Sequence, residues 1–304
     1  MFTGLPYEPF IGEFASLIQK WKSYTAPLDS PLQSMRRELP IYAPKVLLFS
    51  THPDDESLTG VLPLRLLKES GYDIINVIVT LGSKKDRQDQ RYREVQNACD
   101  FLGFKYILAG GDSGFENINL HTRTEDPQIW EEFVATISHI IVQNQPSIIF
   151  IPHENDFHPT HIGTHFLVTD ALGELEKSDH ALNCFIIETE YWATMSKPNL
   201  LVEASPEDVT DLITALSYHY GEIIRNPYHL SFPALLLDNV RRGAEVVKVP
   251  GSKSPDFLFA MLYRVTRFMN GELDDIYEIG KIISIYDNIS DLFSVELNQP
   301  LVTV

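Results

Sequence analysis

The stretch VLLFSTHPDDE, residues 46–56, decides the fold class of this 304-residue chain. Its first four residues are a short apolar run of the kind that forms a buried strand. Similar runs follow at residues 74–79, 106–108, 148–151 and 185–187. Segments with helical spacing of apolar residues separate them, near residues 56–70, 88–102, 128–144 and 160–177. Apolar strands that alternate with helices are typical of a parallel sheet covered on both faces. We therefore expect an α/β fold, Rossmann-like and doubly wound, with a mostly parallel sheet and with N- and C-terminal extensions.

The chain extends well beyond this repeating unit on both sides. Residues 9–24 carry apolar side chains at helical spacing and predict an amphipathic helix, which we expect to pack on the core or on a partner subunit. Residues 207–225 and 233–247 also predict helices, and the pattern after residue 267 assigns no element. The expected division is a helical extension over 1–44, one domain over 45–265, and a C-terminal extension over 266–304 that packs on the same domain.

Composition narrows the class of protein. The chain has 24 Lys and Arg against 42 Asp and Glu, a net charge of −18, which argues against a nucleic-acid partner because phosphate binding needs clustered cations. No apolar stretch is long enough to span a bilayer, and the first ten residues lack the pattern of a signal peptide. Two distant cysteines, Cys99 and Cys184, fit a reducing compartment. We expect a cytoplasmic protein without a membrane anchor.

Polar residues with metal-binding chemistry follow two of the predicted strands. His52 stands beside three acids at the exit of the first strand, and imidazole with carboxylate is a ligand mixture that Zn²⁺ accepts. Acids at a helix start also stabilise its dipole, which is the simpler explanation. The fourth strand leads into residues 153–165, which hold four of the ten histidines. His161 is three residues from His158 and four from His165, so either spacing could place two rings on one face; we favour the former. His153 stays undecided.

Taken together, these motifs resemble a known family. HPDDE at residues 52–56, with His-Pro-x-His at 158–161, is similar to the PIG-L/LmbE family of zinc-dependent N-deacetylases, which includes the N-acetylglucosaminyl-phosphatidylinositol, mycothiol-pathway and bacillithiol-pathway enzymes. Arg91-x-x-Glu94, Glu190-Tyr191-Trp192 and weaker patterns around His219 and Arg241 add to the resemblance, which covers residues 45–265. Taken alone, Arg91 and Glu94 would also fit an exposed helix pair.

The resemblance implies a role for each matching residue. It makes His52, Asp55 and His161 the ligands of Zn²⁺ or another divalent transition metal, Asp54 the general base, and His158 the electrostatic stabiliser or general acid. Thr160 replaces the acid that commonly orients His158, and Asp156 or Asp170 could take its place. The predicted substrate-binding residues are Arg91, Asp112, Asp156 and His219.

The implied reaction is hydrolysis of an N-acetyl group from an N-acetylglucosamine-type sugar or glycoconjugate by metal-activated water. One alternative is another amide or acyl substrate at the same site, because a fold does not specify a substrate. A second is a non-catalytic sugar- or nucleotide-binding module. Against it, no G-x-G-x-x-G follows the first strand, and Gly110-Gly111-Asp112 is too short to cradle a phosphate and more simply forms a turn that places Asp112 near the site. Association of copies of the chain is left open.

Overall fold

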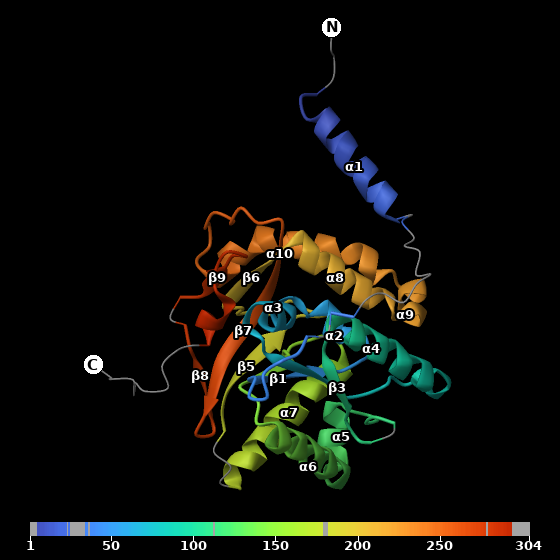
Figure 1. Ribbon diagram of the computed structural model, residues 1–304, viewed down its shortest axis with the longest axis vertical. Coiled ribbons are helices and arrows are strands. Elements are labelled where there is room, and N and C mark those ends of the chain that lie inside the picture. The colour runs from blue at the N-terminus through green and yellow to red at the C-terminus, as the bar shows by residue number, and fades with distance from the viewer. Residues whose placement is uncertain are drawn as a thin grey trace, which may run out of the picture.

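One mixed sheet forms the centre of the protein, and helices cover both of its faces (Figure 1). The structure is a computed structural model and describes residues 5–22, 24, 34–35, 37–111, 113–178, 182–277 and 279–293. Within these residues the sheet has nine strands: β1 (Lys45–Ser50), β2 (Asp73–Ile78), β3 (Lys105–Leu108), β4 (Ile148–Pro152), β5 (Asn183–Thr189), β6 (Leu200–Ala204), β7 (Phe259–Met269), β8 (Glu272–Asp275) and β9 (Lys281–Ile283).

Strand order explains how the predicted motifs meet. The sheet runs β3-β2-β1-β4-β5-β7-β6-β9, with β8 paired to β7. The five strands from β3 to β5 are parallel, whereas β7 is antiparallel to both β5 and β6. All five predicted strands are present, which confirms the mostly parallel, doubly wound α/β fold.

Alternating side chains of the strands feed two large cores, and a third, smaller cluster lies where β6 and β7 meet α10 (Tyr228–Val247). On β1, Val46 and Leu48 face one core, and Leu47 and Phe49 face the other. The first core is covered by α3 (Val61–Ser70), α4 (Gln88–Leu102), α8 (Pro206–Ser217) and α10. The second is covered by α6 (Pro127–Asn144) and α7 (Pro159–Lys177), below the sheet in Figure 1. The remaining short helices are α2 (Asp55–Leu58), α5 (Leu120–Glu125), α9 (Tyr220–Arg225), η1 (Lys85–Arg87) and η2 (Ile289–Leu292).

Two predicted helices are broken where the chain must pack closely. The helix expected over 56–70 is divided into α2 and α3, with Gly60 between them; a Cβ at Gly60 would lie 2.6 Å from Leu212 of α8, so glycine allows this close packing. The helix expected over 207–225 divides after Ser217 into α8 and α9. The apolar spacing continues across both interruptions, so the sequence pattern predicts one continuous helix in each case.

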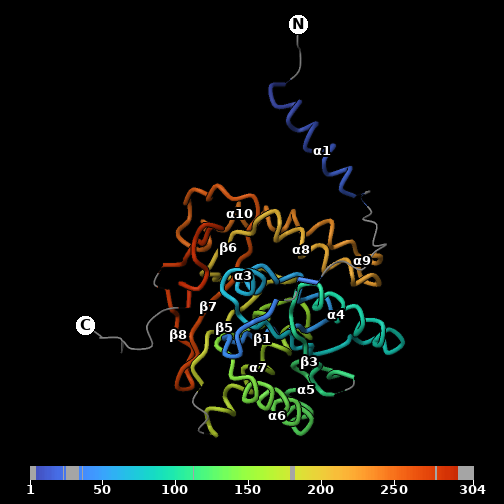
Figure 2. Tube along the Cα trace, in the orientation of Figure 1, coloured from blue at the N-terminus to red at the C-terminus, as the bar shows by residue number. Residues whose placement is uncertain are grey.

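The N-terminal helix α1 (Glu8–Lys22) differs from expectation in its packing. It forms where the apolar spacing predicted it, yet none of its residues is buried. Figures 1 and 2 show it projecting away from the sheet and its covering helices. The expected packing on the core of the same chain is therefore not present.

The C-terminal part adds strands to the same sheet. β7 runs on past residue 265, and β9 pairs in parallel with β6. The buried Arg65 of α3 donates to the backbone oxygens of Glu203 and Ser284, which ties this part to the core. Among the described residues, no helix has both the length and the apolar character that a bilayer crossing requires. Cys99 and Cys184 are free and buried.

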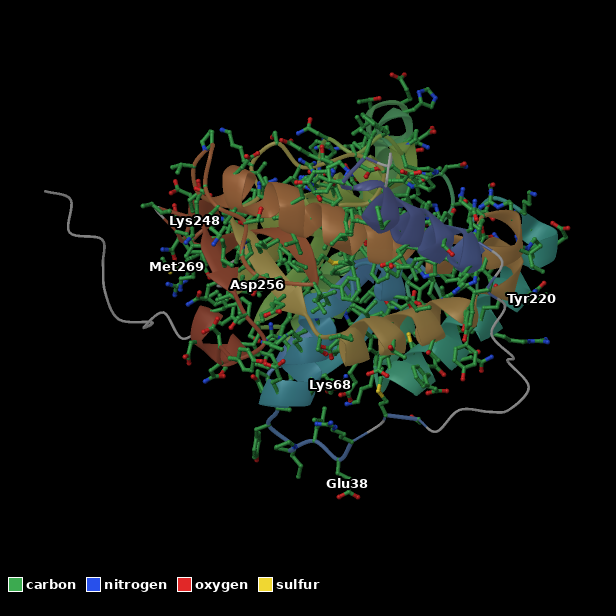
Figure 3. The ribbon with its side chains drawn as sticks, turned by 90° about the horizontal axis from the view of Figure 1, so that it is seen from above. Glu38, Lys68, Tyr220, Lys248, Asp256 and Met269 are labelled. Atoms are coloured by element: carbon green, nitrogen blue, oxygen red, sulfur yellow. The ribbon has the colours of Figure 1, made fainter. Side chains whose placement is uncertain are left out.

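A half-buried ion-pair cluster joins α3 to α8. Lys68, labelled in Figure 3, donates to Asp208 at 2.8 Å and to Asp211 at 2.6 Å. Burial raises the pKa of Asp208, but hydrogen bonds from Lys68 and Ser205 outweigh it, so this pKa lies below its ordinary value of 3.8. Burial lowers the pKa of Lys68, and its two carboxylate partners raise it by more. Both shifts mean that the charged pair is stabilised in the folded protein.

We expect Lys68→Met to lower the free energy of unfolding by about 2 kcal/mol at pH 7, since two charge-assisted hydrogen bonds are lost. Because the folded pKa of Asp208 is lowered, its contribution is complete above pH 3.8 and disappears as the pH falls through the folded value. Urea unfolding between pH 7 and pH 3 measures this. The exposed pair Lys177–Glu174 supplies the control Lys177→Met, which should change little. A difference that vanished already between pH 7 and pH 5 would contradict the assignment.

Candidate metal centre

Two loops bring the predicted site residues to the same edge of the sheet. The HPDDE segment follows β1, and residues 153–161 follow β4. β1 and β4 are parallel neighbours, so their carboxyl ends lie together. The strand order also reverses between them, because β2 and β3 lie beyond β1 and β5 lies beyond β4. In doubly wound sheets, ligands bind at this switch point.

His52, Asp55 and His161 converge at this edge. Their ligand atoms all lie within 4.8 Å of one another. His52 Nδ1 is 3.2 Å from His161 Nε2, and Asp55 Oδ2 is 3.7 Å from the same nitrogen. Burial and the neighbouring His161 hold the pKa of His52 well below its ordinary value, which favours the neutral ring that a metal ligand requires. Two imidazoles and one carboxylate fit a divalent cation with positions left for other ligands.

Asp156 holds the ring of His161 from behind. Its Oδ1 lies 3.5 Å from His161 Nδ1 and accepts a hydrogen bond from the backbone N–H of His158. Its Oδ2 accepts from the backbone of Trp192 at 3.0 Å. A carboxylate on the far nitrogen of a metal-binding histidine fixes the ring and its tautomer. Asp156, predicted to bind substrate, does not line the pocket described below; it supports His161 instead.

Asp54 lies beside the cluster in an unusual backbone conformation. Its φ is 117°, in the region that favours glycine. Among the described residues its carboxyl group has no hydrogen-bond donor, and Arg91 Nη2 lies 4.0 Å from Oδ1. Burial and the adjacent Asp55 hold the pKa of Asp54 well above its ordinary value. The carboxyl group is thus kept apart from the three ligands and is free to exchange a proton.

Glu56 and His219 form a buried pair behind Asp54. Glu56 Oε2 accepts the backbone N–H of Asp54 at 3.0 Å, and Glu56 Oε1 lies 2.7 Å from His219 Nε2. Both side chains are fully buried. His219, predicted to bind substrate, does not reach the pocket; it neutralises Glu56. Glu56 is the last residue of the HPDDE motif, but from the sequence alone we explained it only as an acid at the start of a helix.

His158 borders the cluster on its open side. Its ring centroid lies 5.0 Å from that of His52 and 5.2 Å from that of His161. Its Nδ1 accepts the backbone N–H of Thr160 at 3.3 Å, which leaves the hydrogen of the neutral ring on Nε2. Asp170 cannot orient this ring, because Arg123 and Trp130 hold its carboxylate. Asp156 acts only on the backbone of His158, so neither predicted substitute contacts its ring.

The other predicted residues take four different positions. Arg91 lines the pocket and donates to the backbone oxygen of Pro53 at 3.0 Å. Glu94 is buried and accepts the backbone N–H of Gly221, so the two are not an exposed helix pair. His153 and His165 hold backbone oxygens at 2.9 Å outside the cluster. Asp112 lies outside the described residues.

A pocket of about 540 Å³ opens above the cluster. His52, Asp54, Asp55, His158 and His161 form its base. Its walls come from distant parts of the chain, and apart from Arg91 and the Glu190-Tyr191-Trp192 segment the motifs did not predict them. These include the segment at residues 115–119, the aromatic residues Tyr191, Trp192 and Tyr228, and the charged residues Glu222 and Arg225. Volumes of this size accommodate small-molecule ligands.

Comparison with known proteins decides the family. A family model described as PIG-L, GlcNAc-PI de-N-acetylase, matches residues 47–172, which include both motif loops. The segment at residues 47–172 matches the PIG-L family of deacetylases. This confirms the resemblance seen in the motifs, and the His-Asp-His cluster is that of a zinc-dependent N-deacetylase family. No curated protein sequence matches the chain at a significant level.

Solved structures share the fold of this chain at low sequence identity. N,N′-diacetylchitobiose deacetylase from Pyrococcus horikoshii has 17% identity and a TM-score of 0.54, over 89% of this chain and 96% of its own. The 4-carboxy-2-hydroxymuconate hydratase from Pseudomonas putida KT2440 has 12% identity and a TM-score of 0.54, over 73% and 95%. A deacetylase of teicoplanin biosynthesis has 16% identity and a TM-score of 0.50, over 74% and 98%. Since a hydratase is among them, the fold alone does not fix the reaction.

The cluster predicts which histidine holds the metal. We expect His161→Ala to lose bound zinc, and Asp156→Asn to weaken zinc affinity about 10- to 100-fold through the freed ring of His161. His165→Ala is the matched control and should keep its metal, because its ring holds the backbone of Pro152. Metal content after dialysis and competition with a chelator measure both effects. Loss of zinc in His165→Ala with retention in His161→Ala would reverse the assignment.

Because of the Glu56–His219 pair, we expect two substitutions of Glu56 to lower the free energy of unfolding by different amounts. Glu56→Ala leaves His219 buried without its partner, and we expect a loss of about 3–5 kcal/mol in the free energy of unfolding. Glu56→Gln can still accept from the backbone of Asp54 and donate to a neutral His219, so it should lose clearly less. Urea unfolding of the two variants tests this. Equal losses would mean that the charge, not the hydrogen bonds, carries the stability.

Proposed function

We propose that the protein is a zinc-dependent N-deacetylase that acts on an N-acetylglucosamine-type sugar. The observation that carries this proposal is the arrangement at the base of the pocket. Three donors suited to one divalent cation, the half-buried His52 and the buried Asp55 and His161, lie beside the carboxyl group of Asp54, which is held apart from them. His52, Asp55 and His161 would hold the ion, which when bound polarises the amide carbonyl and makes water more acidic.

Asp54 serves as the general base and then as the acid. It takes a proton from the attacking water and delivers it to the amide nitrogen as the C–N bond breaks, so acetate and a free amine leave. A catalytic carboxyl group works best when its pKa is raised toward the working pH, and burial raises the pKa of Asp54. The glycine-like backbone conformation of Asp54 turns its side chain away from the ligand direction of Asp55.

His158 stabilises the negative charge that develops on the carbonyl oxygen when water attacks the carbonyl carbon. Because Nδ1 accepts from Thr160, the ring presents Nε2–H as a donor. Burial and nearby His161 lower the pKa of His158, which favours this neutral form. A fixed donor aimed at developing charge lowers the barrier without reorganisation.

The walls of the pocket support a sugar as the substrate. Trp192 is 53% exposed, and its ring meets that of Tyr228 edge to face at 6.2 Å, both at the pocket. Aromatic surface combined with polar groups such as Asn117 and Asn119 suits a ring that has apolar faces and hydroxyl edges. The similar chitobiose deacetylase acts, by its name, on an N-acetylated sugar.

We expect Asp54→Asn to keep its zinc and to lower kcat about 10²- to 10⁴-fold, because the proton acceptor is lost while the ligands stay. Asp170→Asn is the matched control, since it lies in an ion pair with Arg123 outside the pocket. Acetate release from N-acetylglucosamine, N,N′-diacetylchitobiose and N-acetylated amino acids measures activity. Acetate release from the N-acetylated amino acids alone would mean that the substrate is an amide other than a sugar. No acetate release from any of these compounds by the zinc-loaded protein would refute the proposal.

A further inference from the structure

The peptide bond between Pro53 and Asp54 is held at both of its polar atoms by charged side chains. Arg91 Nη2 donates to the carbonyl oxygen of Pro53 at 3.0 Å, and Glu56 Oε2 accepts the N–H of Asp54 at 3.0 Å. This carbonyl and this N–H belong to one planar unit, so contacts on its two opposite edges fix its orientation. We call Arg91 and Glu56 the peptide clamp.

The peptide unit after Asp54 is fixed in another way, by the start of α2. The backbone oxygen of Asp54 accepts the N–H groups of Ser57 and Leu58, both at 3.1 Å, and the N–H of Asp55 donates to the backbone oxygen of His52 at 3.3 Å. Both peptide units that flank Asp54 are therefore held from outside. Its φ of 117° is imposed by these contacts, because residues with a side chain avoid this region unless their surroundings enforce it.

Each half of the peptide clamp has its own support. Glu56 Oε1 lies 2.7 Å from His219 Nε2, and Glu222 Oε1 lies 3.8 Å from Arg91 Nε. His219 stands immediately before α9, and Glu222 lies within it. The short segment that carries both, and that includes Tyr220 labelled in Figure 3, thus supports the two sides of the clamp together.

The guanidinium group of Arg91 is directed at the protein itself. The side chain is only 12% exposed, and its Nε is buried on the side of Glu222. Its Nη1 donates to the backbone oxygen of Leu81 at 3.4 Å and lies 2.1 Å from the place that a Cβ on Gly82 would take, so it rests directly against the backbone. Arg91 borders the pocket, but these contacts favour a role inside the protein over contact with a substrate.

We propose that Arg91 is a positioning residue, which as one half of the peptide clamp holds Asp54 in its positive-φ conformation and so fixes the direction of its carboxyl group. This rests on the proposed function, in which Asp54 is the general base. Without the clamp the Pro53–Asp54 peptide unit is free to rotate toward an ordinary φ. That rotation tilts the Cα–Cβ bond of Asp54 and displaces the carboxyl group from the water that it must deprotonate.

Two substitutions at residue 54 test the backbone conformation without turnover. Asp54→Gly and Asp54→Ala both remove the carboxyl group, but only glycine adopts a φ of 117° without strain. In urea unfolding of the zinc-loaded protein, we expect Asp54→Gly to have a higher midpoint than Asp54→Ala. When Arg91→Met is added to both, this difference should disappear or reverse, because a relaxed backbone no longer favours glycine.

Steady-state kinetics separates positioning from substrate binding. We expect Arg91→Met to lower kcat for acetate release from N-acetylglucosamine about 10²-fold with little change in KM, as a catalytic group displaced by about 1 Å does. Arg91→Lys can still donate to the oxygen of Pro53 and should recover part of kcat. Zinc content and the affinity for glucosamine, measured by calorimetric titration, should be unchanged in both variants.

Arg123→Met is the matched control. Arg123 is also a partly buried arginine held by a carboxylate, that of Asp170, but it lies outside the pocket. Its loss should leave both kcat and the difference between the glycine and alanine variants unchanged.

Three results would overturn the proposal: a higher KM or weaker glucosamine binding in Arg91→Met with kcat unchanged, a glycine–alanine difference that Arg91→Met does not alter, or an equal loss of kcat in Arg123→Met. The first result would make Arg91 a substrate contact. Failure of the deacetylase function is distinguishable, since acetate release would then be absent while the urea comparison still decides whether Arg91 holds the backbone of Asp54.

Discussion

The parallel pairing of β1 with β4 is the constraint on which the site depends. Both strands end at the same edge of the sheet, and strand order diverges on either side of them. The loops after the two strands therefore face each other. His52 and Asp55 come from one loop and His161 from the start of the helix after the other, 106 or more residues apart in the chain. Only the register of the two strands brings their donor atoms within 4.8 Å.

The side chains of the three consecutive acids at residues 54–56 point in three different directions because the backbone turns between them. Asp54 has a positive φ and points toward the pocket, Asp55 points to the two histidines, and Glu56 points inward to His219. Burying three carboxyl groups side by side is costly unless each has a compensating partner. Here the metal cluster compensates Asp55, an arginine compensates Asp54 and a histidine compensates Glu56. A change in any one of these partners affects the other two acids.

The sequence could predict the members of the metal cluster but not the residues that support it. Imidazole and carboxylate after two strands indicate a metal, whatever the exact packing. The partner of His161 proved to be Asp156, and the partner of Glu56 proved to be His219, although both had been expected at the substrate. A residue's distance from the pocket depends on how several elements pack, and no local pattern records it. The same holds for Glu222 and Arg225, which reach the pocket from α9 without any motif around them.

The sequence by itself determined the alternation of strands and helices, the parallel sheet, the chemistry of the cluster and the family. The alternation and the parallel sheet follow from residue types and short spacings, whereas the metal chemistry and the family rest on the resemblance of the motifs to a known family. The tertiary structure alone decided that α1 stands apart from the core, that the helix expected over 56–70 forms in two pieces, and that α9 brings Glu222 and Arg225 to the pocket. Each of these depends on contacts between segments far apart in the chain, and such contacts exist only once the two cores have packed on either side of the sheet.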